Sequence, residues 1–206
     1  PLQEKIQGFE QKVEARQKES IIMHSALKEQ LTGLKDLNQV MSKEANNLTK
    51  ALKGDSKMQG NWGELVLERV LEKSNLVKDR EYFVQQSFTL PDGSRVLPDV
   101  VLHLPDGKKM VIDSKVSLTD YERYVNADSE DQEKHLKAHI NSIKKHVDQL
   151  SGKNYHDLYD IESPDFVLMF IPVEPAFAIA SNHDTNLYSK AFESNIVIVT
   201  PSTLLA

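Results

Sequence analysis

Cysteine is absent from the 206 residues of this chain. Its absence excludes a disulfide scaffold, a zinc site built from thiolates and a cysteine nucleophile, and it suits a reducing, cytoplasmic compartment. Long apolar runs are also missing, because no stretch approaches the roughly 18–20 residues needed to cross a bilayer. We therefore expect no membrane contact from this segment. The chain begins at Pro1 without an initiator methionine, so an anchor upstream of it would be missing from this sequence.

Basic residues are fewer than acidic ones, with 25 Lys and Arg against 31 Asp and Glu and a net charge of −6. A nucleic-acid-binding domain usually carries a basic surface, so this charge argues against a generic nucleic-acid binder. The charge is also uneven. Residues 1–59 hold ten basic and eight acidic side chains, a balance of +2, whereas residues 60–206 hold 15 and 23, a balance of −8.

Residues 1–56 predict a long coiled-coil helix, followed by a second domain over 57–206. A seam of positions three and four residues apart holds Leu2, Ile6, Phe9, Val13, Met23, Leu27, Leu34, Leu37, Met41 and Leu48, with polar interruptions at Arg16, Ser20, Gln30 and Glu44. An isolated helix with such a stripe needs a partner, so we expect homo-oligomerisation or contact with another protein through this coil. A long helix folded back on its own domain is the alternative.

The remaining sequence predicts a mixed α/β fold. Apolar periodicity and turn residues indicate helices and strands in alternation. The predicted helices span 61–74, with Asn61 as N-cap, 117–126, 129–150, 174–182 and 184–193, and another begins at Pro201. The predicted strands span 81–90, 95–104, 108–115, 165–172 and 195–200.

Two Pro-Asp-Gly turns, at 91–93 and 105–107, predict a three-strand antiparallel meander. If the second turn is a three-residue loop, Asp99 lies opposite Asp113, and Lys115 shares their face because side chains alternate along a strand. We expect that face to be polar and the opposite face to be hydrophobic. The same reasoning on the first turn places Gln85 opposite Asp99.

Two facing aspartates repel each other and need a counter-charge. A hard divalent cation such as Mg²⁺ would supply it, since Mg²⁺ favours a few carboxylates, several waters and phosphate oxygens. Lys115 could then orient a water or stabilise charge on a phosphate. Alternatively, Lys115 forms ion pairs with both aspartates and no metal is involved.

The segment Pro98-Asp99, thirteen further residues and then Asp113-Ser114-Lys115 resembles the signature of PD-(D/E)xK nucleases. Together with Gly60-Asn-Trp-Gly-Glu64 and residues 170–177, this segment is similar to the RmuC family. That family comprises bacterial proteins described as DNA recombination proteins and candidate PD-(D/E)xK nucleases. The resemblance covers about residues 57–206, and the coiled coil before them also fits the family's layout. Family members typically have an N-terminal membrane segment and extend beyond Ala206.

The resemblance implies a restriction-endonuclease-like core that binds Mg²⁺ or Mn²⁺ and cleaves DNA during recombination, limiting rearrangements. It implies that Asp99, Asp113 and Glu64 are metal ligands, and that these three acids together with Lys115 are catalytic. Helix geometry places Glu64 at the border of the buried stripe formed by Leu67 and Leu71, from which it could reach the sheet. Alternatively, Glu64 only stabilises the start of its helix through the helix dipole.

Other candidates each have a structural alternative. Gln85 could contact metal-bound water or simply be solvated. Glu174 could lie behind the metal ligands or start a helix. Tyr121 could contact a phosphate or pack in the core, and Trp62 could stack on a base or anchor its helix.

Two further groups of candidate side chains, one of lysines and one of histidines, do not belong to the predicted acidic site. Lys108, Lys109, Lys144 and Lys145 could form a limited DNA-binding surface. His135, His139 and His146 line one flank of a predicted helix. The glutamate of the H-E-x-x-H zinc motif is missing between the first two, so a histidine stripe without metal is the preferred interpretation.

Two hypotheses follow from the sequence. The leading one is a metal-dependent DNA nuclease, and the acidic charge favours a narrow site for single strands or ends over a long duplex groove. The alternative is a non-catalytic coiled-coil scaffold whose nuclease-like domain binds DNA structures or a protein partner.

Overall fold

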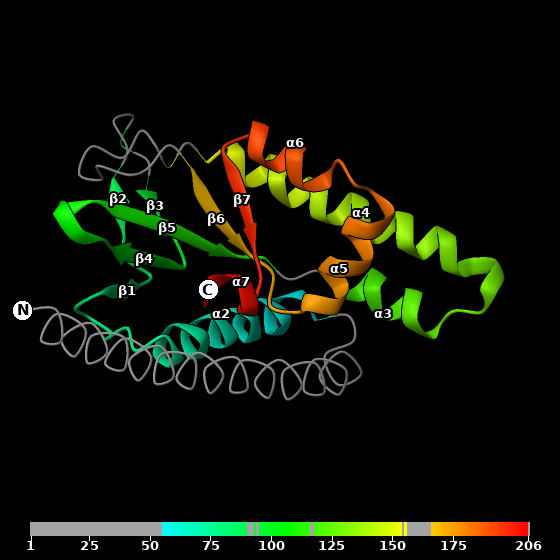
Figure 1. Cartoon of the computed structure of the whole chain (residues 1–206), viewed down its shortest axis with the longest axis horizontal. Coiled ribbons are helices and arrows are strands. Elements are labelled where there is room, and N and C mark those ends of the chain that lie inside the picture. Colours follow the sequence, from blue (N-terminus) through cyan, green and yellow to red (C-terminus); the bar gives the residue numbers. More distant parts are fainter. Residues whose placement is uncertain are drawn as a thin grey trace, which may run out of the picture. The chain divides into compact units, whose positions relative to one another are not determined.

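The computed structural model describes residues 55–89, 93, 95–115, 118–153, 155 and 166–205 (Figure 1). These residues all lie within one compact unit of the chain. The predicted coiled coil lies outside the described residues. The described helical elements are α2 (Ser56–Lys73), a 3₁₀ turn η1 (Pro105–Gly107), α3 (Thr119–Asn126), α4 (Ser129–Ser151), α5 (Glu174–His183), α6 (Leu187–Glu193) and α7 (Pro201–Leu204). None of these helices combines the length and apolarity that a membrane span requires.

The strands form a mixed five-stranded sheet and a small two-stranded sheet. They are β1 (Tyr82–Val84), β2 (Phe88–Thr89), β3 (Arg95–Val96), β4 (Val100–His103), β5 (Lys109–Ser114), β6 (Val167–Phe170) and β7 (Ile196–Val199). The larger sheet has the order β1-β4-β5-β6-β7, in which β1, β4 and β5 are antiparallel and β5, β6 and β7 are parallel. The predicted mixed α/β plan is therefore confirmed, with β5 joining the two halves of the sheet.

The predicted register of both hairpins is confirmed, although the strands are less continuous than expected. Val100 pairs with Ile112 in the second hairpin, and Phe88 pairs with Val96 in the first. The two long strands predicted over 81–90 and 95–104 are each split into two short ones. The first split falls at Gln85, whose φ of 51° lies in the left-handed region and interrupts the extended backbone. Its N–H still donates to the Asp99 carbonyl at 3.0 Å, so the register continues across the break.

Helix α2 begins five residues before its predicted start. Asp55, not Asn61, is the N-cap, and its carboxylate accepts the backbone N–H groups of Lys57 at 3.1 Å and Met58 at 3.0 Å. An N-cap carboxylate satisfies donors that the first helical turn leaves free. Gly60, the residue before the predicted N-cap, lies within the helix.

Helices cover both faces of the large sheet (Figure 1). The side chains of Val101, Val111 and Met169 belong to one hydrophobic cluster with α4, α5 and α6. Because side chains alternate along a strand, Val100 and Ile112 point to the opposite face, where α2 packs against β5. The expectation of one polar face is therefore wrong. Val101 and Val111 are buried under α4, and the polar site is confined to one end of the strands.

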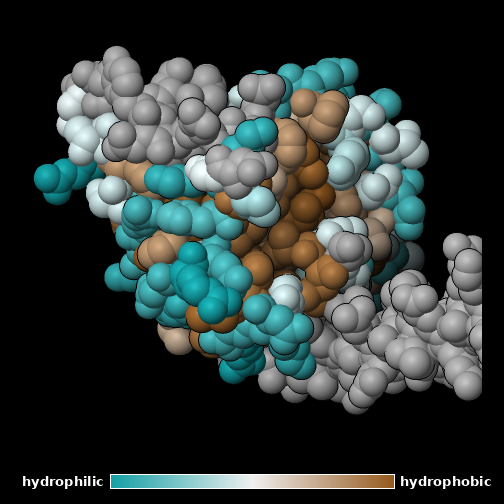
Figure 2. Space-filling model, turned by 60° about the vertical axis from the view of Figure 1, so that its left-hand side comes forward, coloured by the Kyte–Doolittle hydropathy of each residue, from teal (hydrophilic) through white to brown (hydrophobic). Residues whose placement is uncertain are grey.

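The surface of the described residues carries apolar as well as polar areas. Figure 2 shows hydrophobic residues gathered in the centre of one face, with hydrophilic residues massed beside them. Large apolar side chains that remain exposed include Met58, Leu65, Val77, Leu97, Val125, Tyr188 and Phe192. Leu65 and the buried Leu67 thus provide a matched pair on one helix.

We expect Leu67→Ala to lower the free energy of unfolding by about 2–5 kcal/mol, because it removes buried methyl groups and leaves a cavity between α2 and the sheet. Leu65→Ala, at a side chain that is 47% exposed, is the control and should cost less than about 1 kcal/mol. Urea unfolding followed by circular dichroism measures both. Equal losses in the two variants would contradict the packing of α2 described above.

Candidate functional site

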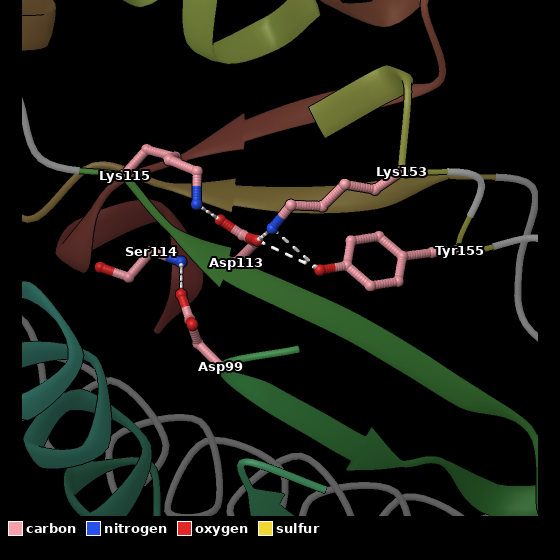
Figure 3. A network of polar contacts seen from close by, with 6 residues as sticks. All are labelled: Asp99, Asp113, Ser114, Lys115, Lys153 and Tyr155. Atoms are coloured by element: carbon pink, nitrogen blue, oxygen red, sulfur yellow. Dashed lines mark hydrogen bonds and ion pairs between the residues drawn. The ribbon is translucent and has the colours of Figure 1, made fainter. Parts of the chain in front are cut away.

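The two predicted aspartates meet at one end of the sheet. Asp99 directly precedes β4, and Asp113 lies near the end of β5. Because the two strands run antiparallel, the start of one lies beside the end of the other. The Asp99 Oδ2 atom accepts the backbone N–H of Ser114 at 2.7 Å, which ties the side chain of one strand to the backbone of the next (Figure 3).

Asp113 is buried, and three side chains donate to its carboxylate. Lys115 forms an ion pair with Oδ2. On Oδ1, the Lys153 ammonium lies at 2.8 Å and the Tyr155 hydroxyl at 3.3 Å. A buried carboxylate is stable only when charged or polar donors replace its lost hydration. Of the ion pairs with both aspartates that the sequence offered as an alternative to metal binding, the described contacts of Lys115 include the one with Asp113, which is part of a larger network.

Lys153 and Tyr155 were not predicted from the sequence. Lys153 follows Gly152, the residue that ends α4, and its ammonium also lies 3.2 Å from the Tyr155 hydroxyl. In Figure 3 it reaches Asp113 from the side opposite to Lys115. The two residues are separated from Asp113 by 40 and 42 positions, and no short motif joins them to it. Only the packing of α4 over the sheet brings them there.

Electrostatics distinguish Asp99 from an ordinary surface carboxylate. Burial, followed by the negative charge of Asp113, raises the pKa of Asp99 from 3.8 to about 6. The Ser114 N–H and the Lys115 ammonium oppose this shift, whereas the charge of Glu64 adds to it. The acid pair therefore resists carrying two negative charges without a further cation.

The network also shifts the pKa values of Lys153 and Tyr155. Burial lowers the pKa of Lys153, but the hydrogen bond and charge of Asp113 outweigh it and raise the pKa above its ordinary value. Burial, with the charge of Asp113, raises the pKa of Tyr155 to about 12. Lys153 is thus charged and Tyr155 is neutral across the physiological range.

Glu64 and Gln85 extend the site toward α2. The Gln85 side-chain amide donates to Glu64 Oε2 at 3.1 Å, while the Gln85 backbone N–H donates to the Asp99 carbonyl. Gln85 therefore links the acid on α2 to the residue that carries the first aspartate. The sequence predicted that Gln85 lies opposite Asp99 and that Glu64 could reach the sheet, but it did not predict the hydrogen bond between Gln85 and Glu64.

Asp99 and Asp113 are the residues that could hold a divalent cation. Apart from Ser114, Asp99 has no hydrogen-bond partner among the described residues, and Asp113 Oδ2 receives only Lys115. Within the described part of the chain, no group of three or more His, Cys, Asp or Glu side chains is placed to hold a metal ion. Glu64 therefore does not complete a ready-made cage with the two aspartates. Water and substrate oxygens would have to fill the remaining positions, which is the coordination that Mg²⁺ favours.

Three weaker candidates have structural positions. Trp62 is buried, as expected for an anchor of its helix. Tyr121 is buried, with its ring centroid 5.6 Å from that of His139, so its ring packs in the interior. Glu174 is the first residue of α5, as its helix-start interpretation predicts, and accepts a hydrogen bond from Ser202 at 2.7 Å.

The lysines predicted to bind DNA come from separate elements. Lys109 begins β5, at the opposite end of that strand from Asp113, and its ammonium lies 5.9 Å from the centroid of the Phe88 ring. Lys144, on α4, forms an ion pair with Asp184 at 2.6 Å. Lys145 is exposed on α4 and Lys108 is exposed just before β5. Their role in DNA binding stays a prediction.

One of the three stripe histidines is drawn into the interior of the fold. His139 is buried and its Nε2 atom lies 2.9 Å from the Ala176 carbonyl oxygen. Burial lowers the pKa of both His139 and His146. His139 therefore lies in the core and not at the boundary expected from the sequence, whereas His135 and His146 are only partly buried.

Comparison with known proteins shows which family this chain is similar to. A family model described as the RmuC family matches residues 1–206. The DNA recombination protein RmuC homolog of Pseudomonas aeruginosa is 49% identical over 207 residues, covering 100% of this chain and 46% of its own length. The DNA recombination protein RmuC homolog of Vibrio cholerae is 46% identical, covering 100% of this chain and 40% of its own length. The DNA recombination protein RmuC of Escherichia coli K12 is 45% identical, covering 100% of this chain and 43% of its own length. This chain spans less than half the length of these curated relatives. No solved structure matches it.

Replacing Asp99 by asparagine tests the electrostatics of the acid pair. Because the pKa of Asp99 is raised in the folded protein, the folded protein binds the carboxyl proton of Asp99 more tightly than the unfolded chain does. The free energy of unfolding therefore falls as the pH rises from about 4 to 6. Asparagine keeps an oxygen for the Ser114 N–H. In metal-free buffer, we expect Asp99→Asn to be more stable than wild type by about 1–3 kcal/mol near neutral pH and nearly equal below about pH 4.

Urea unfolding at several pH values measures this difference. Asp148→Asn, at an exposed position of α4, is the control and should change the free energy of unfolding by less than about 0.5 kcal/mol. A constant difference between Asp99→Asn and wild type at every pH would contradict the raised pKa.

Proposed function

This chain belongs to the RmuC family, and from that premise we propose that it forms part of a protein that acts on DNA during recombination. The relatives named DNA recombination protein RmuC are 45–49% identical to this chain over its whole length. The identity supports a shared role. Because the chain corresponds to less than half of those relatives, the proposal concerns the site that this segment itself carries.

We further propose that this site hydrolyses phosphodiester bonds with the help of a divalent metal ion. The observation that carries the proposal is the convergence of Asp99, Asp113 and Lys115 at one end of the sheet. Two carboxylates beside an ammonium group are the side chains that metal-assisted phosphate hydrolysis requires. The resemblance to the PD-(D/E)xK signature supports the same interpretation.

Mg²⁺ or Mn²⁺ fits these side chains. Asp99 and Asp113 would hold the ion, and burial of Asp99 together with the negative charge of Asp113, which raise the pKa of Asp99, would be offset by a cation at this place. When bound, such an ion polarises a phosphate and lowers the pKa of water. The ammonium groups on Asp113 compete for the same oxygens, so metal binding is expected to rearrange part of this network.

The remaining roles belong to side chains of the chain itself. Lys115 is 21% exposed, so its ammonium can donate to a water or to a non-bridging phosphate oxygen while it stays close to Asp113. Glu64 is held by Gln85 beside the strand of Asp99 and adds negative charge at the same place. The Glu64 carboxylate would accept hydrogen bonds from water bound at the site.

The acidic charge of the domain limits the kind of DNA that fits. Residues 60–206 carry a balance of −8, and a long duplex interface would need many phosphate contacts. A single strand or a DNA end needs fewer of them. We therefore propose a substrate that meets the protein over a short stretch.

A cleavage assay tests the nuclease proposal. The chain is incubated with Mg²⁺ or Mn²⁺ and linear, single-stranded and branched DNA, and products are resolved on denaturing gels. We expect cleavage by wild type and a loss of about 10²–10⁴-fold in Lys115→Met, because the ammonium acts on the reacting groups. Lys137→Met, at an exposed lysine paired with Glu133, is the control and should retain activity. Equal cleavage by wild type and Lys115→Met, or none by either, would refute the proposal.

One observation favours a second candidate function, a non-catalytic DNA-binding or scaffolding domain. Asp113 already has an ammonium group on each oxygen, an arrangement that neutralises it without a metal. Isothermal calorimetry distinguishes the two functions. We expect wild type to bind Mn²⁺ and the double variant Asp99→Asn/Asp113→Asn to bind none at the same concentration. Absence of binding by wild type would favour the scaffold.

A further inference from the structure

Asp113 has two ammonium partners although a single positive charge would balance it. Lys115 forms an ion pair with Asp113 Oδ2. Lys153 contacts Asp113 from the other side (Figure 3). The sequence motif accounts for Lys115 and leaves Lys153 without a role. We propose that Lys153 is a substrate-binding residue that contacts a phosphodiester group of the nucleic-acid backbone. This inference rests on the function proposed above.

The donors of Lys153 support this role. An ammonium group has three N–H donors, and here two acceptors lie within reach: Asp113 Oδ1 at 2.8 Å and the Tyr155 hydroxyl at 3.2 Å. The third N–H has no partner among the described residues. The Lys153 side chain is 38% exposed, whereas that of Asp113 is 1% exposed. Because the Lys153 side chain is partly exposed, its ammonium group can reach solvent, whereas the buried Asp113 carboxylate cannot. Phosphate oxygens are strong acceptors for ammonium groups.

Tyr155 holds Lys153 in place. Tyr155 is buried, its hydroxyl donates to Asp113 Oδ1, and the Lys153 ammonium lies 5.5 Å from the centroid of its ring. A free lysine loses much rotational freedom when it binds a ligand. Lys153 has already lost most of it, because a carboxylate and an aromatic ring fix its ammonium. The charge is thus preorganised beside the acids for a phosphate.

Charge also favours a phosphate at this position. Two carboxylate side chains lie together with two ammonium groups, so the formal charges of the cluster of Asp99, Asp113, Lys115 and Lys153 cancel. A divalent cation held by the aspartates would leave this cluster with excess positive charge. The cations of Lys115 and Lys153 would then flank Asp113 on both sides, where a phosphodiester backbone could contact either of them.

Salt-dependent DNA binding tests the role of Lys153 without requiring cleavage. Fluorescence anisotropy measures binding of a labelled single-stranded oligonucleotide and of a duplex at several salt concentrations, with EDTA or Ca²⁺, and gels confirm that the DNA stays intact. We expect Lys153→Met to weaken binding about tenfold or more for every sequence tested. The slope of log K against log salt should fall in magnitude by about 0.7–0.9, the contribution of one phosphate contact.

Three further variants separate binding from folding. Lys153→Arg keeps the charge and should restore the slope. Tyr155→Phe removes only the hydroxyl, so it should weaken binding about two- to tenfold while leaving the slope unchanged. It also provides a test if Lys153→Met does not fold. Lys137→Met removes an exposed lysine away from the site and should bind as wild type does.

The outcomes distinguish the inference from the function on which it rests. If wild type binds DNA and Lys153→Met keeps the same slope but melts at a lower temperature, Lys153 only neutralises Asp113 and the inference fails alone. If wild type binds neither oligonucleotide under any condition, the proposed action on DNA fails and the inference fails with it. Unchanged binding by Tyr155→Phe would refute the positioning role of Tyr155.

Discussion

The buried carboxylate of Asp113 constrains the structure around it. Removing a carboxylate from water costs several kcal/mol or more, as estimated roughly for real proteins, unless donors replace its hydration. Lys115, Lys153 and Tyr155 provide those donors from both sides. Helix α4 must therefore end at a place from which the residues that follow it, Lys153 and Tyr155, can reach β5. A network required for stability is thus the same network that gathers the side chains of the candidate site.

The register between β4 and β5 connects this burial to chemistry. With Val100 opposite Ile112, Asp99 lies where its carboxylate accepts the Ser114 N–H and experiences the charge of Asp113. A shift of one residue would turn Asp99 to the other face of the sheet, toward α2, and separate the pair. The proximity of the acids therefore depends on the turn at residues 105–107, which contains none of the reactive side chains.

Local features of the sequence predicted the acids well, because Pro-Asp-Gly turns and strand alternation act over a few residues. They predicted both hairpin registers, the position of Gln85 opposite Asp99 and the bounds of most helices. These local features did not predict the contacts that depend on packing between residues far apart in the sequence. Lys153 and Tyr155 join Asp113 only after α4 has folded over the sheet, and the covering of the Val101 face by α4 could not be inferred from alternation. The left-handed Gln85 also escaped prediction, since no glycine marks it.

The mixed sheet has a consequence for the order of folding. The β4–β5 hairpin closes a short loop, whereas pairing of β5 with β6 must bring together residues such as Ile112 and Leu168, separated by more than fifty positions. Short loops close at a lower entropic cost and contact order governs folding speed, so the hairpin is expected to form first. Asp99 and Asp113 would then meet while Asp113 is still hydrated. Lys153 would arrive later with α4, so the last steps of folding would bury the charge and supply its partner together.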